Sequence, residues 1–218
     1  MAEIKAWLRR NLPLVFDRDT ELKTLEVPIF PLNTVLFPGG LLPLRVFEQR
    51  YMDMAKECLR EDKPFGVCLI KEGKEVGSAS VVEEVGCLAR IANWDMPQLG
   101  ILNLETVGMQ RFAIGEKRVE DNGLVVAAVA TVSVEPAQPV PESLQSCVKV
   151  LQQIVQHVGA EKFPSPPHYD DASWVGYRLA EVLPLKLSAR QNMLEMNDSI
   201  MRLQILRKFL IQQGLTND

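Results

Sequence analysis

The segment from Ile29 to Tyr51, IFPLNTVLFPGGLLPLRVFEQRY, restricts the fold of this chain more than any other part of it. Where the chain enters this segment, the apolar residues Leu25, Val27 and Ile29 alternate with polar residues or proline. This period of two predicts a half-buried strand, and its prolines suit only a sheet edge or a strand end. Pro38-Gly39-Gly40 predicts a sharp turn, because proline fixes φ and glycine tolerates positive φ. We expect a second strand after this turn and then a helix that begins at Phe47.

The chain from Leu25 to Val134 has the pattern of a β-rich unit with one inserted helix at residues 45–60. Further apolar runs, separated by turn signals such as Asp121-Asn122-Gly123, predict strands at residues 66–70, 80–91, 100–114 and 124–134. Many strands with turns between them favour a largely antiparallel sheet that closes on itself and so protects its edges.

The character of the chain changes after residues 136–141, a proline-punctuated segment that we interpret as a short rigid linker. Apolar residues at helical spacing from Leu144 to Val158 predict an amphipathic helix. Asp171 is expected to cap the next helix, and Ser188 with Gln191 to form a capping box for another.

A final helix is expected after Asp198, with an inward face made by Ile200, Leu203, Leu206 and Leu210. Together these patterns predict a small bundle of about four helices. A short leading helix is also expected at residues 2–12.

Three groups of residues, taken in order, resemble the N-terminal (LON, substrate-binding) domain of the ATP-dependent Lon proteases. They are Phe30-Pro31-Leu32, Phe37-Pro38-Gly39, Pro43-Leu44 and Phe47-Glu48-Gln49-Arg50-Tyr51; then Val107-Gly108-Met109-Gln110-Arg111-Phe112; and then Leu183-Pro184-Leu185 with Ser188, Gln191 and Leu194. The resemblance implies an α+β fold, in which a PUA-like pseudo β-barrel at residues 1–136 is followed by a small α-helical bundle at residues 137–218.

The charge, the apolar runs and the cysteine spacing of the chain exclude further classes of function. The 218 residues carry a net charge of −4, so there is no excess of Lys and Arg to neutralise phosphates, and nucleic acid is not expected as the main partner. No run of about 18 apolar residues indicates a membrane span, and the N-terminus lacks the pattern of a secretory signal, so we expect a cytoplasmic protein. The four cysteines have no zinc-site spacing, and we expect buried reduced thiols.

No catalytic, metal or cofactor site is predicted. The chain lacks the glycine-rich phosphate loop of an ATPase. The Ser-Lys pair of the Lon peptidase lies in a separate domain, so the resemblance brings no catalytic residue with it. Cys147 and His157 lie ten residues apart on one predicted helix, which is about 15 Å and too far for a nucleophile and its base.

The candidate binding residues are apolar side chains that lie in predicted loops. Trp94, Met96 and Leu99 lie in a predicted loop at residues 93–100, where a Trp and a flexible thioether could contact varied apolar peptide side chains. The favoured interpretation is that this loop packs onto the barrel and covers an open end. Phe163 and Tyr169 pose the same choice, with packing between helices favoured over a recognition surface. We interpret Phe37, Phe47 and Tyr51 as core residues.

The resemblance implies a stand-alone, non-catalytic protein that binds unfolded or degron-bearing polypeptides. Capture would occur in a groove between barrel and helices, or by addition of a strand to an open sheet edge. An adaptor that docks on a protease or another complex, a PUA-like RNA-binding module and a small-molecule receptor remain as alternatives. We expect a monomer or dimer.

Overall fold

The computed structural model describes residues 24–216 except 76, 78 and 79, so the helix expected at residues 2–12 lies outside the described residues. The strands are β1 (Thr24–Leu32), β2 (Leu41–Val46), β3 (Phe65–Glu72), β4 (Val81–Val82), β5 (Val85–Gln98), β6 (Ile101–Val119) and β7 (Val125–Thr131). The helices are α2 (Gln49–Glu61), α3 (Gln145–Val158), α4 (Ala172–Val182), α5 (Leu187–Glu195) and α6 (Ser199–Gln212), with short 3-10 turns η1 (Glu142–Leu144) and η2 (Ala160–Lys162).

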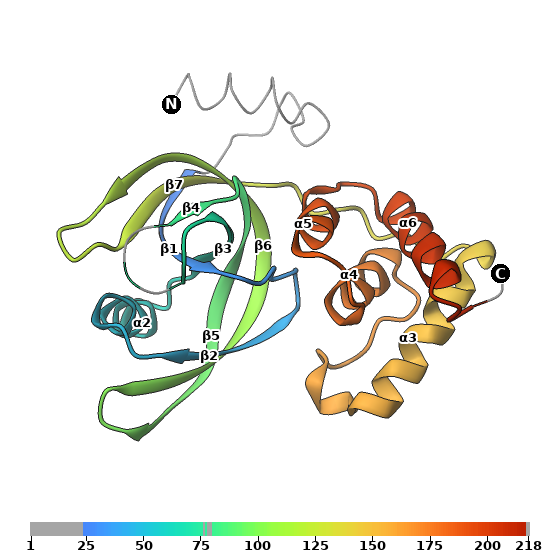
Figure 1. Ribbon diagram of the computed structural model, residues 1–218, viewed down its shortest axis with the longest axis horizontal. Helices are drawn as coiled ribbons and strands as arrows, with labels where there is room; N and C mark the ends of the chain where they lie inside the picture. Colours follow the sequence, from blue (N-terminus) through green and yellow to red (C-terminus); the bar gives the residue numbers. More distant parts are fainter. Residues whose placement is uncertain (1–23, 76, 78–79, 217–218) are drawn as a thin grey trace. The chain divides into compact units, whose positions relative to one another are not determined.

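Contacts divide the chain into two units. One comprises residues 24–38 and Leu42–Val134, and the other comprises Gly39–Leu41 and the chain from Glu135 onward. The first unit holds the strands and α2, and the second holds α3 to α6 (Figure 1).

The strands of the first unit form a ring. Neighbours run in the order β1-β7-β6-β5-β3, each pair antiparallel, and β1 closes the ring by pairing parallel to β3, with Ile29 opposite Gly66 (Figure 1). β2 and β4 attach outside this path, to β6 and β3. The expected α+β class and closing antiparallel sheet are confirmed.

Alternate side chains of these strands enter two hydrophobic clusters on opposite faces of the sheet, as the period of two requires. Val27 and Ile29 of β1 join Phe112 in one cluster. Phe30 of the same strand joins the other cluster, where the apolar face of α2 packs through Tyr51, Met52, Met54, Ala55 and Cys58. Pro28 lies in the half of β1 that pairs with β7 and Pro31 in the half that pairs with β3, so each proline sits where the strand is paired on one side, which is how a strand accommodates proline.

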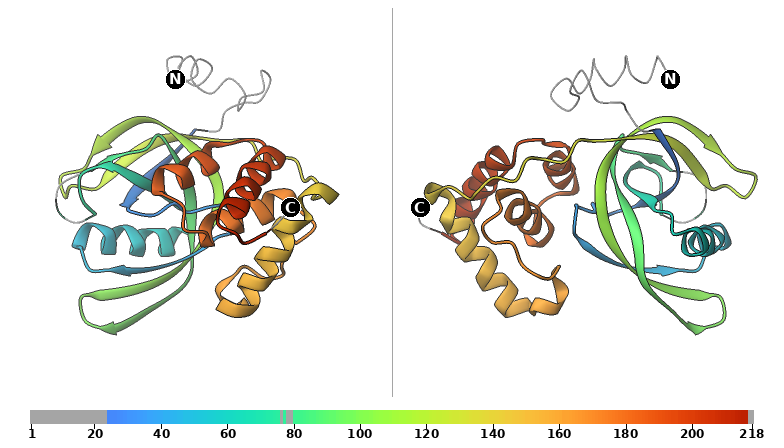
Figure 2. Two further views of the ribbon diagram at one scale, coloured as in Figure 1. Left: turned by 45° about the vertical axis from the view of Figure 1, so that its right-hand side comes forward. Right: turned by 180° about the vertical axis from the view of Figure 1, so that it is seen from behind.

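In the second unit α4 contacts α3, α5 and α6, and Figure 2 shows these helices, yellow to red, from two further sides. The predicted caps at Asp171 and Asp198 are confirmed, because their carboxylates accept hydrogen bonds from the N–H groups of Ser173 and Met201. The predicted capping box is wrong: α5 begins at Leu187 without a side-chain cap, and the Gln191 amide instead donates to Glu195.

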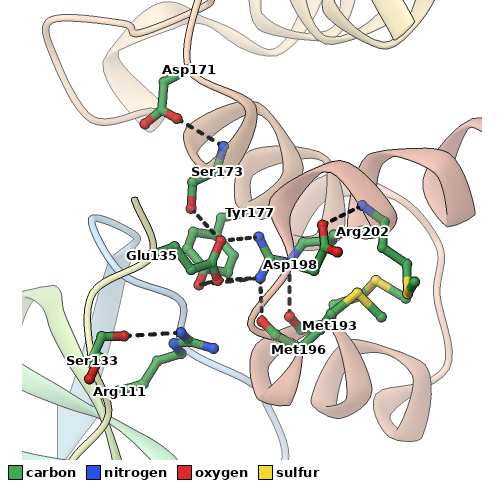
Figure 3. A network of polar contacts seen from close by, with 11 residues as sticks. Arg111, Ser133, Glu135, Asp171, Ser173, Tyr177, Met193, Met196, Asp198 and Arg202 are labelled. Carbon is green, nitrogen blue, oxygen red and sulfur yellow. Dashed lines mark hydrogen bonds and ion pairs between the residues drawn. The ribbon is translucent and has the colours of Figure 1, made fainter. Parts of the chain in front are cut away.

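A buried ion pair ties the segment after β7 to these helices (Figure 3). The Glu135 carboxylate accepts hydrogen bonds from Ser173 Oγ at 2.9 Å, from Tyr177 Oη at 2.6 Å and from both Nη atoms of Arg202. Arg202 is fully buried, donates its Nε–H to the carbonyl of Met193, and stacks 4.1 Å from the Tyr177 ring. Its charge is therefore neutralised inside the unit, as a buried guanidinium requires.

Candidate functional site: a pocket along β2 and the β5–β6 hairpin

Strands β5 and β6 continue past the ring as a two-stranded arm, seen at the bottom of both views in Figure 2. Trp94 lies opposite Leu104, Asp95 opposite Asn103, and Gln98 opposite Ile101. The predicted loop at residues 93–100 is therefore wrong, because only Leu99 and Gly100 form the turn, with Gly100 at φ 86°. The backbone hydrogen bonds of a ladder hold this segment, although Asn, Asp and Pro are typical of loops.

The arm presents three apolar side chains to solvent. Trp94 is 54% exposed, Met96 38% and Leu99 97%. On the opposing strand Leu102 and Leu104 are buried in the cluster beneath α2, which anchors the arm to the first unit. Side chains held on paired strands lose little further freedom when they contact a ligand. The arm can therefore act as a preformed apolar contact.

Phe163 and Tyr169 belong to the second unit. Phe163 is buried, and the half-buried Tyr169 ring packs edge-to-face on Trp174, with 5.3 Å between ring centroids. The exposed His168 ring lies 6.4 Å from the same Trp174. The burial of Phe163 and the ring contact of Tyr169 favour packing within the second unit, whereas Trp94, Met96 and Leu99 lie together on the arm of the first unit.

The first unit also contains a pocket of about 280 Å³ along β2, which the sequence analysis did not predict. It is lined by Phe30, Leu32, Thr34, Leu42, Pro43, Leu44, Arg45, Val46, Phe47, Glu48, Tyr51 and Glu75. Phe30 and Tyr51 of this lining stack on each other, with centroids 4.2 Å apart and planes inclined by 24°. Two aromatic rings fixed by core packing thus form part of the pocket wall.

Phe47 stands at this pocket and is 55% exposed, so the expectation that it is a core residue is wrong, whereas Phe37 and Tyr51 are buried as expected. The expected helix start at Phe47 is also wrong, because α2 begins at Gln49 with Glu48 as its N-cap. Leu44 and Val46 point inward, and alternation along the strand turns the next side chain outward. The alternation of inward and outward side chains along β2 therefore predicts that Phe47 points outward.

Charged groups gather beside these two rings. The Arg50 guanidinium lies 4.6 Å above the Tyr51 ring, pairs with Glu48 at 2.9 Å and donates to the carbonyl of Gly123 at 3.0 Å. Burial raises the pKa of Tyr51, so its hydroxyl stays neutral at physiological pH. Glu75 accepts a hydrogen bond from the N–H of Asn33. The Glu48 carboxylate is therefore already compensated by Arg50, and the pocket offers mainly apolar contact.

A second cavity, of about 460 Å³, lies between β1, α2 and the β6–β7 hairpin. Most of its charged lining residues pair with one another or with neighbours: Arg118 binds Glu26 at 2.6 Å and Glu120 at 3.2 Å, and Lys63 binds Glu61. These exposed pairs leave no focused charge, so this cavity is the weaker candidate.

The described residues contain no group of three or more His, Cys, Asp or Glu side chains that could hold a metal ion. All four cysteines are buried and free, and burial raises the pKa of the Cys58 and Cys147 thiols to about 11. A nucleophilic cysteine needs a lowered pKa, so these thiols are suited to packing. Over the same residues, no helix is long and apolar enough to cross a membrane.

Comparison with known proteins agrees with this architecture. A crystallised Lon N-terminal domain protein from Xanthomonas campestris is 35% identical, with a TM-score of 0.71 over 84% of this chain and 98% of that one. The N-terminal domain of a Mycobacterium avium complex Lon protease shares the fold at 16% identity, with a TM-score of 0.55 over 84% of this chain and 96% of that one.

Among curated proteins, the Lon protease of Cytophaga hutchinsonii is 26% identical over 199 residues, and that of Escherichia coli strain K12 is 28% identical over 193 residues. These matches cover 85% and 84% of this chain but only 24% of each relative, so the chain spans about a quarter of their length. Residues 26–212 match the family model for the ATP-dependent protease La (LON) substrate-binding domain. The chain therefore belongs to the LON substrate-binding domain family.

Proposed function

We propose that this protein is a non-catalytic polypeptide-binding protein that captures exposed apolar segments of unfolded or degron-bearing chains. Membership of a family defined by substrate binding supports the role, and the relatives that carry the name Lon protease are much longer than this chain. The described residues supply apolar contacts rather than a nucleophile with an adjacent base.

The observation that carries the proposal is the apolar arm, defined by Trp94, Met96 and Leu99. Large apolar side chains are usually withdrawn from water, and a group of them held outward on a rigid hairpin is typical of a contact surface. An aromatic ring and a flexible thioether accommodate varied partner side chains. Such a surface suits reversible capture without selection for one sequence.

The test is a titration of the purified protein with reduced, carboxymethylated α-lactalbumin, which is unfolded, and with native α-lactalbumin as the matched control. Saturable binding of the unfolded form alone, with that chain recovered intact, is the expected result. Equal binding of both forms, or of neither, would contradict the proposal. Adding a structured RNA as a competitor separates the PUA-like RNA-binding alternative, which predicts displacement.

An adaptor role is the second candidate, and α6 favours it. Leu203, Leu206 and Leu210 are buried, yet Met201, Ile205 and Ile211 are 51%, 38% and 41% exposed. A helix with apolar residues around most of its circumference is typical of one that contacts a further partner. Recovery of one folded, stoichiometric partner from a lysate, lost in the Met201→Ser/Ile205→Ser variant, would favour the adaptor over capture of unfolded chains.

A further inference from the structure

The described part of the chain leaves the apolar arm uncovered. Among the described strands, β5 pairs with β3 only as far as Ala89, and beyond that residue it pairs with β6 alone. Leu99 at the turn is 97% exposed, and Trp94 is 54% exposed. Large apolar side chains grouped on one surface favour a covering partner, because contact with it removes them from water.

The same chain carries an apolar segment that lies outside the described residues. We call residues 2–12 the N-terminal segment, in which Ile4, Trp7 and Leu8 stand at positions i, i+3 and i+4. This is the spacing of an apolar helix face. A helix of about 11 residues is marginal in water by itself, and packing of its apolar face on another surface stabilises it. The N-terminal segment and the arm thus have complementary requirements.

The register of the strands limits the distance between the two. Thr24, where β1 begins, lies opposite Ala130 of β7, and Ala130 lies opposite Ala113 of β6. Trp94 lies opposite Leu104, nine residues from Ala113 along β6. Three steps of about 5 Å between strands and nine of about 3.3 Å along β6 give a path of about 45 Å. The straight-line separation of Thr24 and Trp94 is no longer than this path.

The chain before Thr24 is long enough to cover that distance. A fully extended chain from Trp7 to Thr24 spans up to about 60 Å, and with residues 2–12 helical it still spans about 50 Å. The chain from Phe16 to Thr24 spans only about 28 Å. The tether therefore lets Trp7 and Leu8 reach the arm by any path over the strands, whereas Phe16 cannot follow the strands that far.

The charges of the arm favour the same occupant. Asp95 and Glu105 are exposed, and neither has a hydrogen-bond or ion-pair partner in the described part of the chain. Arg90, at the base of the arm, offsets one of these charges. Asp95 lies five residues nearer the turn, about 16 Å from Arg90 along the strand and beyond the screening length of physiological salt. Arg9 and Arg10 follow directly after Trp7 and Leu8, and a guanidinium there is complementary to Asp95.

We propose that the N-terminal segment docks on the apolar arm through Trp7 and Leu8, with Arg9 or Arg10 at Asp95, and that a client polypeptide must displace it. This inference rests on the proposed function and deepens it, because it names an internal competitor that regulates access to the arm. A tethered segment has an effective concentration of about 1 mM, so a weak contact with a Kd of about 0.2 mM keeps the arm covered most of the time.

A cross-link in the full chain tests the docking without any client. The variant Asn11→Cys/Gln98→Cys is treated with a short bis-maleimide, to which the four buried native thiols react slowly. Asn11 lies on the same predicted helix face as Ile4, and Gln98 is next to the turn of the arm. We expect a product of one chain, formed at a rate that does not depend on protein concentration.

The matched control is Asn11→Cys/Lys117→Cys. Lys117 is exposed on β6, four residues from Ala113, and therefore lies nearer to Thr24 than the arm does. A tether without a docking site would join Asn11→Cys to Lys117→Cys more readily than to Gln98→Cys. We expect the Gln98→Cys pair to react at least about fivefold faster, because docking raises the local concentration at the arm.

Substitutions in the segment test its role as a competitor. In the otherwise unchanged chain, Trp7→Ser/Leu8→Ser should raise the affinity for carboxymethylated α-lactalbumin about fivefold, because the arm is no longer covered. Added to the Asn11→Cys/Gln98→Cys chain, the same change should slow the cross-link about fivefold. Val15→Ser/Phe16→Ser removes two apolar side chains close to Thr24 and should change neither quantity. Circular dichroism verifies that each variant is folded.

Equal or faster cross-linking of the Lys117→Cys pair would overturn the inference, as would equal effects of the two serine double variants. A cross-linked product of two chains would assign the arm to the N-terminal segment of a second copy and would also overturn it. If carboxymethylated α-lactalbumin binds while the cross-link shows no preference for the arm, the proposed function stands and the internal competitor is excluded. If that client binds neither the unchanged chain nor Trp7→Ser/Leu8→Ser, the proposed function fails and the regulation fails with it.

Discussion

The backbone of Gly108 in β6 passes against the carbonyl oxygen of Phe37, so closely that a Cβ at position 108 would collide with that oxygen. The obstacle is backbone, with the Leu36 side chain close behind at 3.1 Å, so a rotamer change cannot relieve it. This contact holds the segment that precedes Pro38 against the ring. It gives a physical reason for the glycine of the Gly-x-x-Arg-Phe pattern at this point in the sequence.

Gly108→Ala should therefore destabilise the protein strongly. Overpacking a core commonly costs about 1–3 kcal/mol, and a clash with fixed backbone should cost about 3 kcal/mol or more. The free energy of unfolding in urea measures this loss. Gly100→Ala is the control: it also introduces a Cβ, at φ 86°, but meets no atom within 4 Å. Its cost should be only about 1 kcal/mol from backbone strain. Equal losses in the two variants would contradict the steric argument.

Glu135→Gln should destabilise the second unit, because it leaves the fully buried Arg202 without a countercharge. Breaking a buried ion pair on one side typically costs about 3–5 kcal/mol. Glu120→Gln, which removes a partner of Arg118 in an exposed pair, should cost less than about 1 kcal/mol. Chemical denaturation measures the free energy of unfolding of both single variants. If the double variant Glu135→Gln/Arg202→Met is not more stable than Glu135→Gln alone, the uncompensated Arg202 charge is not the cause.

The fold was largely predictable because its strands and helices carry clear periods. Val27 and Ile29 in β1, and the apolar stripe of α3, lie inward as the sequence indicates. The arm was not predictable, because Asn93 and Pro97 disfavour strands locally, and pairing across β5 and β6 outweighs that preference. Strand pairing joins residues distant in sequence, so local propensity does not report it.

The candidate site was predicted only in part. The apolar residues of the arm were identified from residue type alone, while the pocket along β2 was missed because the sequence pattern suggests that Phe47 is a core aromatic residue. A pocket depends on how β2, α2 and the end of β1 meet, which no single segment encodes. Pro43 within β2 was the available signal, since a proline inside a strand indicates an open edge.

Stability should fall as pH rises toward neutrality through Glu181 on α4. Burial raises the pKa of Glu181 from 4.5 to about 7, although Arg178 and Arg190 oppose the shift. The folded state then binds a proton more tightly than the unfolded state. The protonated Glu181 side chain therefore contributes fully to the free energy of unfolding below about pH 4.5, and this contribution is lost as pH rises through 7. Between pH 5 and 8 the native protein should lose about 2 kcal/mol relative to Glu181→Gln, measured by urea unfolding. Parallel pH profiles for the two proteins would exclude Glu181 as the group responsible.

The four thiols should resist modification in the folded protein. Each is buried, and burial also raises the pKa of Cys68, so the reactive thiolate is scarce. Ellman's reagent at pH 8 should react slowly with the native protein and promptly with all four cysteines in guanidinium chloride. Fast reaction of one thiol in the native state would show that its part of the core opens readily.

Trp94→Ala/Met96→Ala should weaken binding of carboxymethylated α-lactalbumin by about tenfold, because large side chains at a contact surface dominate its affinity. The melting temperature should change little, since both residues are exposed and changes at such positions usually alter stability by less than about 0.5 kcal/mol. Met109→Ala, which is 44% exposed on β6, is the matched control and should leave both quantities unchanged. Isothermal titration calorimetry measures the affinities. An unaltered affinity in the double variant would remove the arm from the binding surface, and an equal loss in Met109→Ala would show that any exposed apolar residue suffices.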